Sequence, residues 1–200
     1  MHLILAACVY GDPHIVTLDG FKYTFNGLGE FVLIETSDDS FTLQGRMVQA
    51  LDDDGTPISA TVFSAIVGKE FYSDTVQFQL ADDDIEVLMN GELVDFEGLA
   101  EQQFNNVTVR KSNSSASAIF ASGVYVEVRV ANGFLSTLLV SLAESYRTQT
   151  SGLMGNYNGV QSDDLLPRGA TTPIPLTSSL RDIHNRFGVT CESVNVVSLS

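Results

Sequence analysis

The chain has 200 residues, 44% of them apolar and 18% charged, so it can bury a sizeable core as one domain. Its 25 acidic and 10 basic residues give a formal net charge of −15, which argues against a nucleic-acid partner because binding phosphates requires positive charge. No apolar run reaches the roughly 18 residues that span a bilayer, so we expect no membrane insertion by this segment.

The beginning of the chain is apolar but carries no basic n-region, so residues 1–10 are predicted to be a leader or fragment edge rather than a signal peptide. The chain has two cysteines, Cys8 here and Cys191 near the other end. A disulfide between them would close nearly the whole chain and add roughly 2 to 5 kcal/mol of stability. The sequence leaves open whether they pair.

The next segment, Gly11-Asp12-Pro13-His14, is chemically suggestive. The Asp12 carboxyl can attack its own backbone carbonyl carbon, close a five-membered anhydride ring and expel the Pro13 nitrogen. The tertiary amide of proline accepts a proton readily on leaving, and His14 is a candidate proton donor. In most sequences, however, Asp-Pro simply starts a turn.

Period-two alternation dominates the middle of the chain and predicts half-buried strands. It is clearest in residues 21–25 and 124–130, where aromatic side chains or valines recur at every second position. Further predicted strands are 30–35, 41–50, 61–67, 75–80, 85–89, 92–96 and 106–111. Asn90-Gly91 and Asn132-Gly133 suit the positive φ angles of tight hairpin turns.

Two kinds of polar segment separate the strands. The acidic clusters 52–55 and 82–84 are predicted to be solvated turns without a ligand role. Asn106-Val107-Thr108 and Asn113-Ser114-Ser115 are N-glycosylation acceptor sequences. Modification at Asn106 and Asn113 would place the chain in the secretory pathway.

After Leu153 the chain becomes rich in Gly, Asn, Asp and Pro. Within this loop, four side chains offer the oxygen ligands that Ca²⁺ prefers, namely Asn156, Asn158, Asp163 and Asp164. Their spacing does not fit an EF-hand, and the same residues are also ordinary turn formers. Beyond the loop, Ser178–Phe187 has helical spacing of apolar residues, with Ser178 or Ser179 as N-cap and Gly188 as stop.

These patterns predict a mainly β fold with stacked antiparallel sheets (β-sandwich-like), a long Gly/Asn/Asp loop and a short C-terminal helix. Few histidines, no phosphate-binding glycine loop and no cysteine pair at metal-ligand spacing argue against a turnover enzyme. A hydrolase that uses paired carboxylates stays open as an alternative, because carboxylate separation is set by the fold.

Two separated segments resemble one known family. Residues 11–25, beginning Gly-Asp-Pro-His and ending Phe-Lys-Tyr-Thr-Phe, resemble the opening of von Willebrand factor type D domains. Residues 152–159, Gly-Leu-Met-Gly-Asn-Tyr-Asn-Gly, resemble a second family segment. The chain is most similar to the cysteine-poor variety found in membrane mucins and sushi-domain-containing surface proteins, and Ser151 and Met154 stand where the family usually has cysteines.

The resemblance implies a domain over residues 11–175, followed by a helix and tail over 176–200. It implies an extracellular or cell-surface adhesion or mucin-type module within a larger protein, cleaved between Asp12 and Pro13 with both pieces still associated. It also implies a calcium site in which Asp19 joins the loop residues. The implied partners are other extracellular or cell-surface proteins, including neighbouring modules of the same chain. An uncleaved interaction domain is a further alternative.

Overall fold

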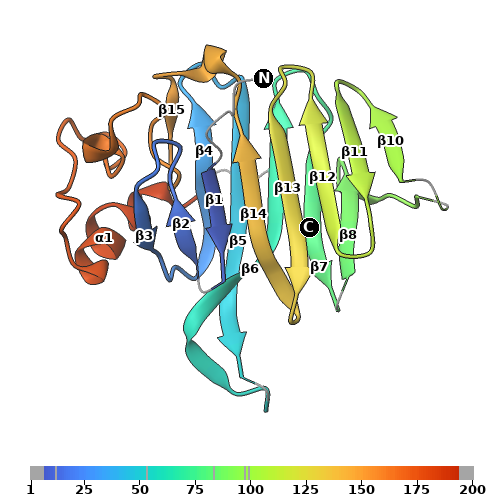
Figure 1. The fold of residues 1–200 in the computed structure, drawn as a ribbon, viewed down its shortest axis with the longest axis horizontal. Coiled ribbons are helices and arrows are strands. Elements are labelled where there is room, and N and C mark those ends of the chain that lie inside the picture. Colours follow the sequence, from blue (N-terminus) through green and yellow to red (C-terminus); the bar gives the residue numbers. More distant parts are fainter. Residues whose placement is uncertain are drawn as a thin grey trace.

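The structure, a computed structural model, describes residues 7–193 except 12, 53, 83, 97 and 99. Its strands form one antiparallel sheet that curls over into two packed layers, as Figure 1 shows. The layers are joined where Leu135 of one pairs with Phe63 of the other. The predicted fold class of stacked antiparallel sheets with a short C-terminal helix is therefore confirmed.

The first layer has the strand order β3-β2-β1-β14-β13-β12-β11-β10. Its strands are β1 (Ala7–Tyr10), β2 (His14–Val16), β3 (Lys22–Thr24), β10 (Glu101–Phe104), β11 (Val107–Lys111), β12 (Ser115–Phe120), β13 (Tyr125–Ala131) and β14 (Phe134–Ser141). Along β13 the buried Val126 and Val128 alternate with partly exposed neighbours, as the period-two pattern predicts.

The second layer has the order β15-β4-β5-β6-β7-β8-β9. Its strands are β4 (Gly29–Thr36), β5 (Phe41–Leu51), β6 (Pro57–Glu70), β7 (Val76–Ala81), β8 (Asp84–Met89), β9 (Glu92–Leu93) and β15 (Thr150–Ser151). The predicted strand 92–96 is thus shorter than expected. Both predicted Asn-Gly hairpin turns are present, with φ of 52° and 86° at Asn90-Gly91 and of 55° and 73° at Asn132-Gly133.

The core lies between the layers and is built from both. Phe41 of β5 and Phe120 of β12 meet edge to face with ring centroids 5.6 Å apart, and both side chains are buried. Phe78 of β7 and Val140 of β14 are equally buried. Burying one such side chain stabilises the fold by about 1.5 to 3 kcal/mol. The apolar side chains packed between the two layers together therefore contribute most of the stability of the fold.

The C-terminal helix α1 (Leu180–Arg186) packs beside the first strands, as Figure 1 shows. Ser179 caps it by accepting a hydrogen bond from the Asp182 backbone N–H. Ile183 and Phe187 are buried, whereas Leu180 is 60% exposed, so only part of the predicted apolar face packs. The 3-10 turn η3 (Gly188–Cys191) follows α1 and contacts β4.

Both ends of the described chain belong to the fold. Residues 7–10, which the sequence predicted to be part of a leader or fragment edge, form β1, and Ala7 and Val9 are buried between β14 and β2. Residues 1–6 lie outside the described part of the chain. Cys8 in β1 and Cys191 in η3 are both free thiols in the structure, which does not pair them. Burial raises the pKa of Cys191 to about 12.

None of the helices in the described residues is long and apolar enough to cross a membrane.

Candidate functional site

The expected cleavage motif lies at the tip of the hairpin between β1 and β2. Asp12 itself falls outside the described residues, but both of its neighbours are held in place. The Gly11 backbone N–H donates to the carbonyl of Ser136 in β14 at 3.2 Å, and the Pro13 carbonyl accepts from the Phe25 N–H at 3.1 Å. Hydrogen bonds therefore fix the chain on both sides of the Asp12–Pro13 bond.

Ser136 was not predicted to take part in this site. In β14, Thr137 pairs with Arg129 and Leu135 pairs with Val130, so Ser136 is the extra residue of a β-bulge. The bulge leaves the Ser136 carbonyl free to accept from Gly11. The sequence does not reveal the bulge, because the extra residue interrupts the alternation of apolar and polar residues by which a strand is predicted.

The other two predicted cleavage residues differ in their surroundings. Pro13 is buried, whereas His14 is exposed. The His14 Nδ1 lies 2.8 Å from Thr24 Oγ1, and its ring centroid is 5.4 Å from that of Tyr10. His14 is thus oriented by its neighbours and open to water.

The second candidate site is the loop that follows β15. Leu153 and Met154 donate backbone hydrogen bonds to the carbonyls of Val32 and Leu33 in β4, at 3.1 and 2.9 Å. On its other side, the Met154 carbonyl accepts from the Leu18 N–H at 2.9 Å. The loop is therefore held between β4 and the segment that follows β2.

Two glycines of this loop are required by its geometry. Gly152 has φ of 119°, and a Cβ there would lie 2.6 Å from the Leu33 carbonyl oxygen. Gly155 has φ of 77°, and a Cβ there would lie 2.3 Å from Asp164 Oδ1. Both conformations disfavour any other residue, which explains the Gly-Leu-Met-Gly motif physically.

Asp19 holds the far part of the loop. Its carboxylate accepts hydrogen bonds from the backbone N–H groups of Asn158 and Gly159, at 3.0 and 2.8 Å. Its carbonyl accepts from Gln161 Nε2 at 2.9 Å. Asp19 lies at the site as predicted, and in this structure both of its carboxylate oxygens already have partners within the loop.

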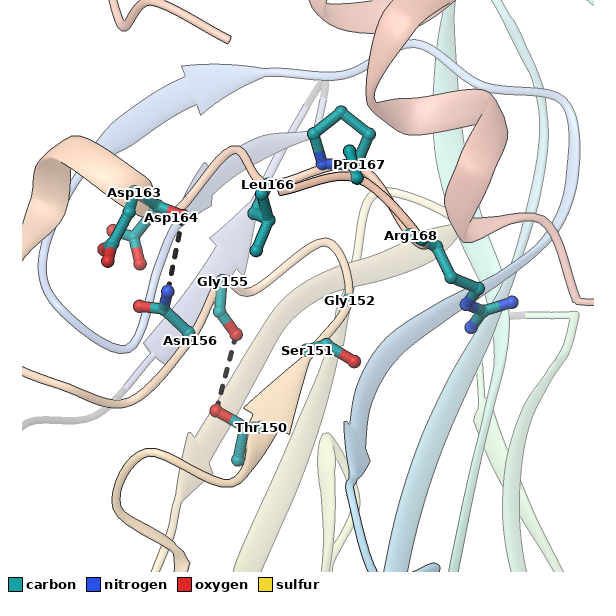
Figure 2. Close-up of a pocket in the computed structure, with 12 residues that line it drawn as sticks. Thr150, Ser151, Gly152, Gly155, Asn156, Asp163, Asp164, Leu166, Pro167 and Arg168 are labelled. Carbon is teal, nitrogen blue, oxygen red and sulfur yellow. Dashed lines mark hydrogen bonds between the residues drawn. The ribbon is translucent and has the colours of Figure 1, made fainter. Parts of the chain in front are cut away.

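Asn158 also has partners within the loop. Its Oδ1 accepts from the Val160 N–H at 2.7 Å, and its Nδ2 donates to Asp163 Oδ2 at 2.9 Å. Asn156 Nδ2 donates to the Asp163 carbonyl at 3.3 Å. Figure 2 shows Asn156, Asp163 and Asp164 gathered at one end of the loop. The structure therefore brings together all five residues predicted for the calcium site.

Three oxygens at this site are buried without a hydrogen-bond partner, namely Asn156 Oδ1, Asp163 Oδ1 and Asp164 Oδ1. An unpaired buried acceptor costs roughly 1 to 3 kcal/mol, so three together call for a further binding partner. All three belong to side chains predicted to bind calcium, and they are amide and carboxylate oxygens, which Ca²⁺ prefers.

Asp164 is the most buried of these residues, with 2% of its surface exposed. Burial raises its pKa to about 7, and the negative charges of Asp19 and Asp163 act in the same direction. A hydrogen bond from Thr17 Oγ1 to Asp164 Oδ2, 2.6 Å long, opposes the shift. Thr17 was not predicted as part of the site, and its only sequence signal is its place within the motif of residues 11–25.

The donor set fits calcium better than a transition metal. No group of three or more His, Cys, Asp or Glu side chains in the described residues is arranged to hold a metal ion by itself. A cation in this loop would therefore depend on the Asn156 amide oxygen together with Asp163 and Asp164, and mixed amide and carboxylate ligation is typical of Ca²⁺.

The two predicted glycosylation sites are exposed and lie at opposite ends of β11. Asn106 is in the turn between β10 and β11, and Asn113 is in the turn between β11 and β12. The two residues are close in sequence, but the strand between them separates them by roughly 20 Å. Glycans at these two positions would meet different surroundings.

Comparison with known proteins identifies one family. The family model for the von Willebrand factor type D domain matches residues 7–170. The human sushi domain-containing protein 2 is 34% identical over 86% of this chain, and human mucin-4 is 36% identical over 92%. Protein mesh of Bombyx mori is 32% identical over 90%. The chain spans 21%, 4% and 12% of these three proteins, respectively.

Proposed function

We propose that this chain, which belongs to the von Willebrand factor type D family and is an extracellular structural module, cleaves itself once between Asp12 and Pro13 and binds calcium. The module is extracellular or at the cell surface. We infer that it serves adhesion or assembly within a larger tethered or secreted protein. Its partners would be other extracellular or cell-surface proteins, including neighbouring modules of the same chain.

Self-cleavage follows from the chemistry of one bond. An oxygen of the Asp12 carboxyl attacks the Asp12 carbonyl carbon, the C–N bond to Pro13 breaks, and the Pro13 nitrogen takes up a proton. Water then opens the resulting five-membered anhydride. The hydrogen bonds to Gly11 and Pro13 support this proposal, because a fixed backbone limits the conformations available to the attacking group. His14, exposed beside the bond, would supply the proton.

The same hairpin accounts for association of the two pieces after cleavage. The N-terminal piece would keep β1, which pairs with β14 on one side and with β2 on the other. Ala7 and Val9 of this strand are buried in the core. Cutting the covalent link therefore leaves the hydrogen bonds and the apolar packing of β1 in place.

The test of self-cleavage is the mass of the purified chain after incubation at neutral and at mildly acidic pH. We expect a product that begins at Pro13, and we expect Asp12→Ala to abolish it. Asp54→Ala, which removes an exposed acidic residue elsewhere, should cleave like the unchanged protein. An intact chain under all of these conditions would contradict cleavage and favour the uncleaved interaction domain.

If cleavage occurs, size-exclusion chromatography tests whether the pieces stay together. We expect both pieces to elute as one species in native buffer and to separate in denaturant. Separation in native buffer would contradict the role assigned to β1.

Calcium binding rests on one observation, the three buried oxygens of Asn156, Asp163 and Asp164 that have no hydrogen-bond partner. These side chains would hold the cation, and its positive charge would favour the ionised form of Asp164 in a buried position. Because Asp19 and Leu18 link this loop to the first strands, calcium would stabilise the contact between the beginning and the end of the domain.

The hydrolase alternative has less support from the site. Asp164 has the raised pKa of a general acid, but only 2% of its surface is exposed, which is little for a group that must contact a substrate. Its hydrogen bond to Thr17 and its unpaired Oδ1 fit a cation ligand better. We therefore propose no turnover activity for this chain.

A further inference from the structure

Two aromatic side chains project together from the turn between β6 and β7. Phe71 and Tyr72 are 65% and 77% exposed, and their rings meet edge to face with centroids 4.7 Å apart. A single exposed aromatic residue needs no explanation, but two in contact form a contiguous apolar patch, the kind of surface that marks binding sites when other groups extend it.

The turn that carries Asn106 is bound directly to this aromatic turn. Asn106 Nδ2 and Asn105 Nδ2 each donate to the Tyr72 carbonyl at 2.9 Å. The Asp74 backbone N–H donates to the Asn105 carbonyl at 3.1 Å, and the Asn105 N–H donates to Asp74 Oδ2 at 3.0 Å. Four hydrogen bonds thus fix Asn106 relative to the two rings.

Asn106 and both aromatic residues line one groove of about 470 Å³, together with Asp38, Ser40 and Glu70. A group attached at Asn106 Nδ2 would therefore begin at the wall of this groove. N-glycosylation replaces one of the two Nδ2 hydrogens, and the other can keep the hydrogen bond to Tyr72.

The chemistry of the groove suits a sugar. N-acetylglucosamine has a face of C–H groups that packs against the electron-rich face of an aromatic ring. Its hydroxyl groups need hydrogen-bond partners, which Asp38 and Ser40 can provide at the rim. Among the described residues, the second acceptor site offers no such arrangement, because the aromatic residue that lines the groove next to Asn113 is the buried Phe96.

We propose that Asn106 carries an N-linked glycan whose first N-acetylglucosamine units pack on Phe71 and Tyr72 and cover this apolar patch. The glycan would thereby stabilise the contact between the β6–β7 turn and the β10–β11 turn. This inference rests on the extracellular location of the chain and is independent of cleavage and calcium, so its failure would leave those proposals untouched.

The test is a double-mutant cycle on the chain secreted from a eukaryotic cell line, at constant calcium. Thr108→Val removes the acceptor sequence and keeps Asn106, whereas Thr108→Ser preserves it and is the matched control. Each is made with the native aromatic pair and with Phe71→Ser/Tyr72→Ser. Glycopeptide mass spectrometry measures occupancy, and thermal denaturation measures Tm.

We expect Asn106 to be occupied and Thr108→Val to lower Tm by about 2 to 4 °C relative to Thr108→Ser when the aromatic pair is present, the shift that 1 kcal/mol causes in a domain of this size. Without the pair, that difference should vanish. Asn113→Gln should change Tm equally in both backgrounds. An unoccupied Asn106, or the same Thr108→Val effect in both backgrounds, would overturn the proposal.

If the aromatic variants are not secreted, proton NMR of the unchanged glycoprotein tests whether the sugar on Asn106 packs on the two rings. Protons of the sugar on Asn106 should shift upfield in the ring currents of Phe71 and Tyr72, relative to those of the sugar on Asn113. Equal shifts for the two sugars would overturn the proposal.

Discussion

Two acid-rich turns of this chain have similar compositions and opposite environments. In the turn of residues 52–55, Asp52 Oδ1 accepts from the N–H groups of Asp54 and Thr56, and the side chains of Asp52 and Asp54 are exposed. In the loop of residues 156–164, three oxygens are buried without partners. Acidic residues therefore indicate a cation site only where their oxygens are buried away from water and have no hydrogen-bond donor within the protein.

A pair of matched glycines gives the largest expected contrast. Gly55 and Gly155 have nearly equal φ, 76° and 77°, but a Cβ at Gly55 meets nothing within 4 Å, whereas one at Gly155 lies 2.3 Å from Asp164 Oδ1. We expect Gly155→Ala to cost about 3 kcal/mol or more and Gly55→Ala about 1 to 2 kcal/mol. Urea denaturation measures both, and equal costs would contradict the tight packing of the 156–164 loop.

Calcium should distinguish the two turns almost as strongly. At a calcium concentration of 100 times Kd, the unchanged chain should gain about 2.7 kcal/mol over the chelated chain. Asp163→Asn should remove most of this gain, because it weakens a ligand, whereas Asp54→Asn should keep it. Thermal denaturation with calcium or chelator measures the difference. A gain retained by Asp163→Asn would place the cation elsewhere.

The pH dependence of stability should identify Asp164. Its pKa is about 7 in the folded chain and about 3.9 in an unfolded one. In chelator, the protonated form is therefore favoured by folding, and stability should fall as pH rises from about 4 to about 7, by on the order of 1 kcal/mol per pH unit.

Asp164→Asn is the comparison for this effect, because it cannot ionise. The difference in unfolding free energy between it and the unchanged chain in chelator should follow this pH window. A difference that stays constant with pH would show that Asp164 titrates normally. Calcium should reverse the trend, since it binds the ionised carboxylate.

The smallest expected effect concerns the polar contacts of Glu35 with Ser151 and Arg168, which lie on either side of the 156–164 loop in the sequence. Ser151 stands where the resembled family usually has cysteine, and its Oγ donates to Glu35 Oε1 at 3.0 Å. Arg168 binds the same oxygen at 2.8 Å, with about a third of each side chain exposed. We expect Arg168→Gln to cost about 0.2 to 1 kcal/mol, measured by urea denaturation. A larger loss would mean that these contacts compensate for an absent disulfide.

Local patterns predicted the strands whose alternation is unbroken. The valines around β13 and the two Asn-Gly turns are examples, because both depend on the period of the strand and on φ alone. The Asn132-Gly133 turn implied a strand after it, but the bounds of β14 were not predicted, because the bulge at Ser136 separates the buried Leu135 and Leu138 by three residues. β1 was missed because an apolar run at a chain end looks like a leader.

The sequence predicted which residues gather at the candidate calcium site, but not the hydrogen bonds that each of them makes there. Asp19, Asn158 and the three residues with unpaired oxygens were all expected to be ligands. The structure divides them, since the carboxylate of Asp19 and the Oδ1 of Asn158 bind backbone N–H groups. Such a division depends on contacts between residues about 140 positions apart, as between Asp19 and Gly159, which no local pattern contains.

The most direct test of the calcium site is a calorimetric titration of the chain with Ca²⁺ at pH 7.5 and at pH 6. We predict one calcium ion per chain, weaker binding at pH 6 because Asp164 must lose its proton, and no binding by Asp164→Asn. No heat of binding at either pH, or equal binding by Asp164→Asn, would contradict the assignment of this loop as a calcium site.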